Sequence, residues 1–157
     1  MAGYPTQAEA QSQATLTLAR DTAQPYSLAV ALHFAAMLVH LRRDVSAVLC
    51  YADELLALTQ AQGFPHWKAT GTVFHGWALA MHGSASAGLA EEVGQGIDAL
   101  MALGAGVAQP YCGAILVEVY DRASHSAEGL AVAAEILLRV EQMDDRFYET
   151  ELYRLQG

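Results

Sequence analysis

The sequence predicts an all-α protein built from antiparallel helix hairpins. Strand signals are nearly absent, and stretches rich in Ala, Leu, Glu and Gln, with apolar residues three and four positions apart, recur along the whole chain. The 157 residues are 54% hydrophobic and only 16% charged, which favours one domain with a sizeable core over a disordered chain.

Breaks in this pattern divide the chain into about seven to eight helices. The first helix follows Pro5, the second Pro25, the fourth Pro65 and the sixth Pro110, at positions where the missing N–H of proline costs nothing. The other helices follow short polar or glycine-containing breaks. The expected ranges are 5–20, 26–42, 45–62, 66–82, 86–103, 111–123, 127–142 and 145–156. Connections of two to seven residues favour antiparallel neighbours.

The hairpins that begin at Pro25, Pro65 and Pro110 are spaced 40 and 45 residues apart, which is typical of stacked helical pairs. We name the first helix of each pair helix A and the second helix B. In each pair, a small or slim residue of helix A is followed twelve positions later by another in helix B, and close helix crossings need such residues. These residues are Ala36 with Val48, Gly76 with Gly88, and Val117 with Gly129. The pattern therefore predicts a short α-solenoid.

Several stretches of the chain resemble the tetratricopeptide-type helical repeats in the C-terminal regions of large bacterial signalling ATPases, among them adenylate/guanylate cyclase-like and MalT-like proteins. The stretches that carry this resemblance are Gly3-Tyr4-Pro5 with Ala8, Gln62-Gly63-Phe64-Pro65, Gly76-Trp77-Ala78-Leu79-Ala80, Glu128-Gly129-Leu130-Ala131 and Tyr148-Glu149-Thr150-Glu151-Leu152-Tyr153-Arg154-Leu155. The resemblance implies a regulatory or interaction role. The chain has no G-x-x-x-x-G-K-[ST] phosphate loop. Its period exceeds the roughly 34 residues of common tetratricopeptide repeats, so a HEAT-like or irregular α-solenoid stays open as an alternative.

In this register residues 1–157 form one tetratricopeptide-like domain with incomplete ends. It starts with a helix B, near 5–20, and finishes with a helix A, near 145–156. Each terminal helix is expected to present an apolar stripe, and the candidate residues are Leu16, Leu18, Leu152 and Leu155. Solenoids normally need polar caps, so we predict self-association, most simply as a two-fold dimer.

Charge and hydropathy limit the classes of partner. Eight Lys and Arg against seventeen Asp and Glu give a net charge of −9, which argues against nucleic acid and anionic membranes. Residues 81–157 hold 12 acids and 4 bases, or −8. The most apolar run, 28–39, is too short to cross a bilayer, and no signal peptide is evident, so the chain is expected to be soluble and cytoplasmic.

Helix A lines the concave face in the array that the resemblance implies, and this places a candidate binding groove there. The groove candidates are His33, Met37, His40, Val73, Trp77, Tyr111, Glu118, Asp121 and Arg122. Such a groove would hold a peptide or a small molecule, although Met37 and Trp77 could equally be packing residues. The chain has no Asn and a single Lys, Lys68, which disfavours a carboxylate clamp and favours a basic or apolar partner segment.

Metal and catalytic sites are weakly indicated. His33 and His40, like His75 and His82, lie seven residues apart, about 10.5 Å along a helix, which is too far for one ion. No metal or other cofactor is therefore expected. The two cysteines form no C-x-x-C motif and are expected to be buried. Glu118 and Asp121 could form a carboxylate pair for acid/base catalysis, but a solvated pair neutralised by Arg122 is the simpler interpretation.

Three glycines, Gly88, Gly94 and Gly96, lie inside the expected helix 86–103, where each costs roughly 0.5–1 kcal/mol relative to Ala. They mark that helix as the weakest, and as a place of motion or of close approach by a neighbour. The favoured function is a non-catalytic interaction scaffold that binds a protein segment or itself. A MalT-like small-molecule sensor is the second hypothesis, and an unrecognised enzyme is the third.

Overall fold

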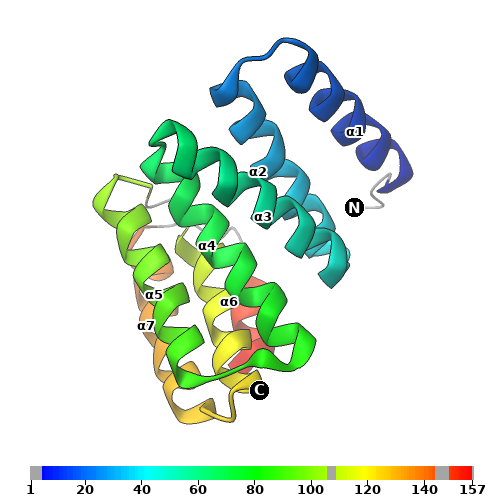
Figure 1. Ribbon diagram of the computed structural model, residues 1–157. Helices are drawn as coiled ribbons and strands as arrows, with labels where there is room; N and C mark the ends of the chain where they lie inside the picture. The colour runs from blue at the N-terminus through cyan, green and yellow to red at the C-terminus, as the bar shows by residue number, and fades with distance from the viewer. Residues whose placement is uncertain (1–4, 106–108, 144–148, 157) are drawn as a thin grey trace. The chain divides into compact units, whose positions relative to one another are not determined.

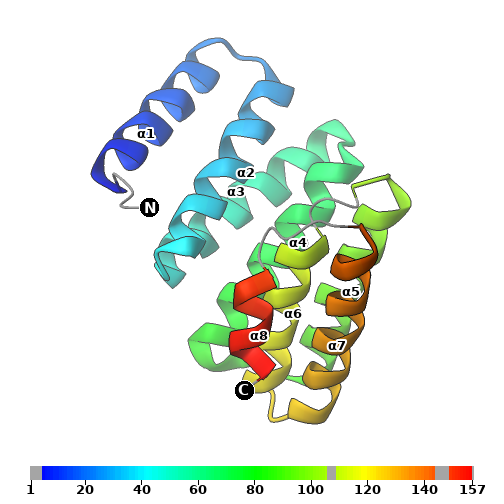
Figure 2. The same ribbon diagram turned by 180° about the vertical axis from the view of Figure 1, so that it is seen from behind.

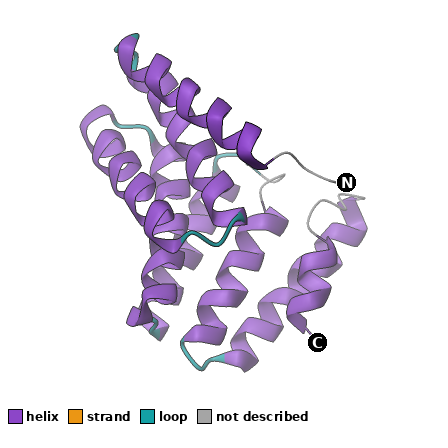
Figure 3. Ribbon diagram, turned by 90° about the vertical axis from the view of Figure 1, so that its right-hand side faces the viewer, coloured by secondary structure: helices purple, strands orange, loops and turns teal. Residues whose placement is uncertain are grey.

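The computed structural model describes residues 5–105, 109–143 and 149–156. These residues form eight α-helices and one π-helical turn, and they contain no strand (Figures 1 and 3). The prediction of an all-α fold is confirmed. No helix among the described residues is long and apolar enough to cross a membrane.

The chain divides into two compact units, residues 1–75 and residues 76–157. The division falls within helix α4, Pro65–Leu79. The remaining helices of the first unit are α1 Pro5–Asp21, α2 Pro25–Leu41 and α3 Val45–Gln62. Those of the second unit are the π-helical turn η1 Ala80–Ser84, α5 Ala87–Ala102, α6 Gln109–Arg122, α7 Ser126–Met143 and α8 Glu149–Gln156. The prediction that residues 1–157 form one continuous array stays a prediction.

Local sequence signals account for the helix ends. Proline occupies the first position of α2 and of α4, as expected from its fixed φ and missing N–H. The Asp44 carboxylate accepts a hydrogen bond from the N–H of Ala47 at 3.1 Å, and the Ser86 hydroxyl accepts one from the N–H of Leu89 at 3.1 Å. Gly63 ends α3 with φ 71°, a left-handed conformation that glycine adopts without steric cost.

In the first unit, α2 lies between α1 and α3 (Figures 1 and 2). Alanines on α2 allow this close packing, and leucines from the three helices fill the centre. The buried residues of this core are Leu16, Ala19, Ala29, Ala31, Leu32, Ala35 and Leu55. Two ion pairs bridge the outer surface, Arg20 with Glu54 at 2.8 Å and Arg42 with Glu9 at 2.6 Å.

In the second unit, α6 is the central helix and contacts α5, α7, α8 and η1. Residues 110–117 of α6 are all buried, so this helix has no solvent-facing stripe over that length. Helix α8 packs against α6 and α7 (Figure 2). Its Leu152 belongs to a cluster with Ala114, Ile136 and Leu137.

The terminal helices differ from the sequence prediction. Leu16 is 1% exposed and Leu152 is 0% exposed, because α1 and α8 bury these side chains against their own unit. Leu155 is half-buried against the same cluster as Leu152. Leu16 and Leu152 therefore cannot form exposed stripes for self-association. Leu18 is 64% exposed, as that prediction requires. The expected helix start at residue 145, like Gly3, Tyr4 and Tyr148 of the resemblance, lies outside the described residues.

Of the small-residue helix crossings predicted from the sequence, one is confirmed and one is wrong. An added Cβ at Gly129 would lie 3.5 Å from the carbonyl oxygen of Val117, so this pair marks a close approach of α6 and α7. An added Cβ at Gly76 would overlap the Val93 Cγ2 atom. Gly88 is exposed with no atom within 4 Å of an added Cβ, so the predicted Gly76–Gly88 crossing is wrong, and Val93 takes the place of Gly88.

Candidate functional site

The residues predicted to line a groove are divided between the two units and differ in burial. His33, Met37, His40 and Val73 belong to the first unit, and Trp77, Tyr111, Glu118, Asp121 and Arg122 belong to the second. Four of them are buried: His40, Val73, Trp77 and Tyr111. His33, Met37 and Glu118 are half-buried, whereas Asp121 and Arg122 are exposed. Val73, Trp77 and Tyr111 are thus packing residues, and the predicted groove is not formed by them.

His33 lies in an aromatic cluster of the first unit. Its ring centroid is 5.0 Å from that of Phe34, 5.3 Å from that of Trp67 and 5.8 Å from that of Phe74. Burial, with a smaller contribution from His66, lowers the pKa of His33 from 6.5 to about 4. The imidazole is therefore neutral at physiological pH and acts as a packing group. Within the described ranges, no three His, Cys, Asp or Glu side chains gather closely enough to hold a metal ion.

The carboxylates of Glu118 and Asp121 have separate partners. Glu118 Oε2 accepts a hydrogen bond from the indole Nε1 of Trp77 at 2.8 Å, and Trp77 is fully buried. The Asp121 carboxylate accepts a hydrogen bond from the Ser126 hydroxyl at 3.5 Å. Glu118 thus orients a core tryptophan, and this geometry does not favour a shared catalytic role for the two carboxylates.

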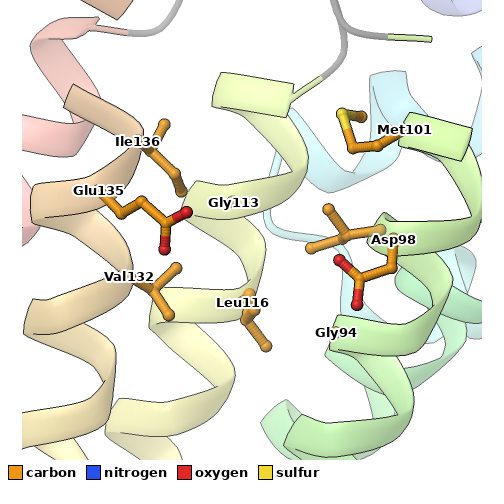
Figure 4. Close-up of a pocket in the computed structure, with 9 residues that line it drawn as sticks. Gly94, Asp98, Met101, Gly113, Leu116, Val132, Glu135 and Ile136 are labelled. Atoms are coloured by element: carbon orange, nitrogen blue, oxygen red, sulfur yellow. The ribbon is translucent and has the colours of Figure 1, made fainter. Parts of the chain in front are cut away.

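A pocket of about 310 Å³ opens between α5, α6 and α7 in the second unit (Figure 4). We call it the α5–α7 pocket. It is lined by Gly94, Ile97, Asp98, Met101, Gly113, Leu116, Val132, Glu135 and Ile136. The side chains of Ile97, Leu116 and Ile136 are buried and form an apolar floor, whereas Asp98 and Glu135 are exposed at the rim. The pocket is consequently a preformed depression that is open to solvent.

Helical spacing explains why these residues share one site. The lining residues of α5 lie at positions i, i+3, i+4 and i+7, those of α6 at i and i+3, and those of α7 at i, i+3 and i+4. Gly94 leaves the space open, because the nearest side-chain atom to an added Cβ would be Leu116 Cδ2 at 4.0 Å. At Gly113 an added Cβ would overlap Ile136 Cδ1, so α6 and α7 are in close contact beneath the pocket.

The electrostatics of the pocket are acidic. Its two charged lining residues are both carboxylates, and none of the lining side chains is basic. The sequence of the second unit holds 12 acids and 4 bases, a net charge of −8. Such a site attracts a cation and repels an anion. Apolar floor atoms beside exposed carboxylates therefore suit a ligand with an aliphatic body and a cationic end.

None of the nine residues that line the α5–α7 pocket is among those predicted from the sequence to line a groove. Gly94 was the one lining residue with a sequence signal, because it was expected to allow motion of its helix or close approach by a neighbour. The structure places Gly94 at the opening between α5 and α6, where it provides space for an occupant. The two rim carboxylates had no sequence signal that distinguished them from other surface acids.

The fold and the site define a helical protein with an open, apolar pocket that has an acidic rim. Comparison of the chain with protein-family models, with curated proteins and with solved structures finds no match.

Proposed function

We propose that the protein is a non-catalytic interaction module that binds a segment of a partner protein at the α5–α7 pocket. The observation that carries this proposal is the preformed apolar floor of Ile97, Leu116 and Ile136 beneath an exposed rim. An open rim allows a polypeptide to pass over the surface while one of its side chains enters the pocket. The resemblance to tetratricopeptide-type repeats favours the same class of function.

A small-molecule sensor is the second candidate, and the pocket volume favours it. Ligand sites usually measure roughly 300–1,000 Å³ and bury most of the ligand surface. The α5–α7 pocket, at about 310 Å³, is at the small end of that range. Because its rim is exposed, a free ligand would stay partly solvated. A side chain of a bound polypeptide would be covered by the rest of its own segment, and this difference favours the interaction module.

The test uses a matched pair of glycine substitutions on α5. Gly94→Leu fills the pocket without a Cβ clash, and Gly88→Leu adds the same side chain at an exposed position away from it. Both changes replace glycine in a helix, so each should preserve or slightly raise stability. Peptides are selected from a random display library on the full wild-type chain, and their affinities are then measured on all three proteins.

We expect the selected peptides to bind the wild type and Gly88→Leu equally and to bind Gly94→Leu at least about tenfold more weakly, about 1.4 kcal/mol. Peptides that bind all three proteins alike would contradict the proposal. A parallel thermal-shift screen with metabolites tests the sensor, since a ligand at 100 times its Kd adds about 2.7 kcal/mol of stability. A metabolite shift that Gly94→Leu abolishes, without any selected peptide, would favour the sensor.

Self-association remains a separate proposal. Of the four leucines assigned to it from the sequence, Leu18 on α1 is the most exposed and is the one to test. We expect light scattering to give a dimer for the wild type and a monomer for Leu18→Glu. A monodisperse wild-type monomer at micromolar concentration would contradict self-association and would leave the pocket proposal unaffected.

A further inference from the structure

We infer that the occupant of the α5–α7 pocket is an arginine side chain of the bound segment, with its guanidinium between Asp98 and Glu135. This inference rests on the proposed function, because it names the side chain through which the partner segment is recognised. Its basis is the combination of a concave apolar floor with carboxylates on two opposite helices.

The two carboxylates face the pocket from opposite sides. Asp98 belongs to α5 and Glu135 to α7, and α6 lies between these helices (Figure 4). Figure 4 shows both side chains directed inward over the segment of α6 that carries Gly113 and Leu116. A planar guanidinium has five N–H donors in a fixed fork and can donate to two carboxylates at once. An ammonium group is a compact, strongly hydrated point charge, so lysine should bind more weakly than arginine.

The floor supplies the second half of the recognition. Ile97, Leu116 and Ile136 present buried aliphatic carbon, and the three methylenes of an arginine stem can cover it while the charged head stays near water. A neutral aliphatic side chain would also cover the floor, but it would bring no positive charge to the rim carboxylates. An acidic side chain would meet like charge. The chemistry of the lining thus selects a cationic group on an apolar stem.

The test separates charge from shape. The probes are N-butylguanidinium, its neutral counterpart N-butylurea, and the capped peptide Ala-Ala-Arg-Ala-Ala with its citrulline counterpart. Each is titrated into the full-length ¹⁵N-labelled chain and followed by amide chemical shifts. The variants are Asp98→Asn, Glu135→Gln and the double variant. Glu91→Gln serves as the control, since it removes one negative charge from an exposed position of α5 that does not line the pocket.

We expect the arginine peptide to shift amides around residues 94–101, 113–116 and 132–136 and to bind about five- to tenfold more tightly than the citrulline peptide. Each rim variant should weaken the arginine peptide by about two- to fivefold, in the range of exposed ion pairs, and Glu91→Gln by less than about twofold. The double variant should bring the arginine and citrulline peptides to within about twofold of each other. Added salt should weaken the arginine peptide and leave the citrulline peptide unchanged.

Equal binding of the arginine and citrulline peptides to the wild type, or an undiminished preference in the double variant, would overturn the inference. If N-butylguanidinium binds as tightly as the arginine peptide, the guanidinium group does not come from a polypeptide, and a free guanidinium compound is the ligand. Failure of the proposed function gives a different result from failure of this inference. If the proposed function is wrong, display selection yields no peptide whose binding is weakened by Gly94→Leu. If selection succeeds but the selected peptides lack a required arginine, only the present inference fails.

Discussion

Replacing Gly76 by alanine should destabilise the second unit, although alanine is the better helix former. A Cβ at Gly76 would overlap the Val93 Cγ2 atom, and it would also lie 3.7 Å from Leu89 Cδ1. Ordinary carbon–carbon contacts are about 3.5–4.0 Å, so Val93 would have to move by more than about 1 Å. Val93 is fully buried, and a β-branched side chain in a helix has one strongly preferred rotamer. The clash therefore cannot be relieved by a simple rotation.

The magnitude follows from two opposing terms. Overpacking a core costs about 1–3 kcal/mol, and the stiff, buried neighbour places Gly76→Ala in the upper half of that range. Alanine regains about 1 kcal/mol of helix propensity, which leaves a net loss of about 1–2 kcal/mol. Gly88→Ala is the matched control, because nothing lies within 4 Å of its added Cβ. We expect this control to gain at most about 0.5 kcal/mol, because Gly88 lies in the first turn of α5 and not in its middle.

The assay is urea denaturation followed by the fluorescence of Trp77, which lies in the second unit, in a background where Trp67 is replaced by phenylalanine. The midpoint should fall for Gly76→Ala and rise for Gly88→Ala, with an unchanged slope in both. Similar rises of the midpoint for both substitutions would contradict the predicted clash between Gly76→Ala and Val93, since helix propensity alone would then explain them.

Three further outcomes can be checked. The pKa of His33 is about 4 in the folded chain and 6.5 in the unfolded chain, so between these pH values only the unfolded chain binds a proton at this residue. The free energy of unfolding should therefore be highest above pH 6.5 and fall by about 3 kcal/mol toward pH 4. Urea denaturation at a series of pH values should show this fall in the wild type and not in His33→Phe. Burial raises the pKa of the Cys112 thiol to about 12, whereas Cys50 is exposed, so mass spectrometry should detect one rapidly alkylated cysteine and a second only after denaturation. Glu118→Leu removes the 2.8 Å acceptor of the Trp77 indole and should cost about 1–3 kcal/mol, whereas Glu118→Gln keeps an acceptor and should cost less, both measured by urea denaturation.

Local signals were sufficient to predict most helix ends. Proline begins α2 and α4, and the polar residue Asp44 caps α3, so these ends depend on short-range chemistry that is written in the sequence. The end of the fourth helix differs, because the predicted range 66–82 is an α-helix only to Leu79 and continues as the π-helical turn η1. Gly83, with φ 97°, interrupts the helical geometry inside η1. The sequence also predicted two buried cysteines, but Cys50 is exposed, since composition does not reveal which face of α3 meets the core.

The pocket could not be predicted from the sequence because the apolar stretch 110–117 of α6 has no polar face that would show which side of the helix is open to solvent. At 100° per residue, Gly113 and Leu116 lie roughly 140–200° around α6 from Tyr111, on the side opposite the residues expected to line a groove. Hydrophobic periodicity identifies a face only when the other face is polar, and residues 110–117 are buried on all sides. What turns one side of α6 into a floor is the absence of side-chain volume at Gly94 and Gly113, which depends on how α5 and α7 approach it. The site is therefore a property of the packing of three helices, and substitutions that change volume at Gly94 test it more directly than any change at the residues selected from sequence.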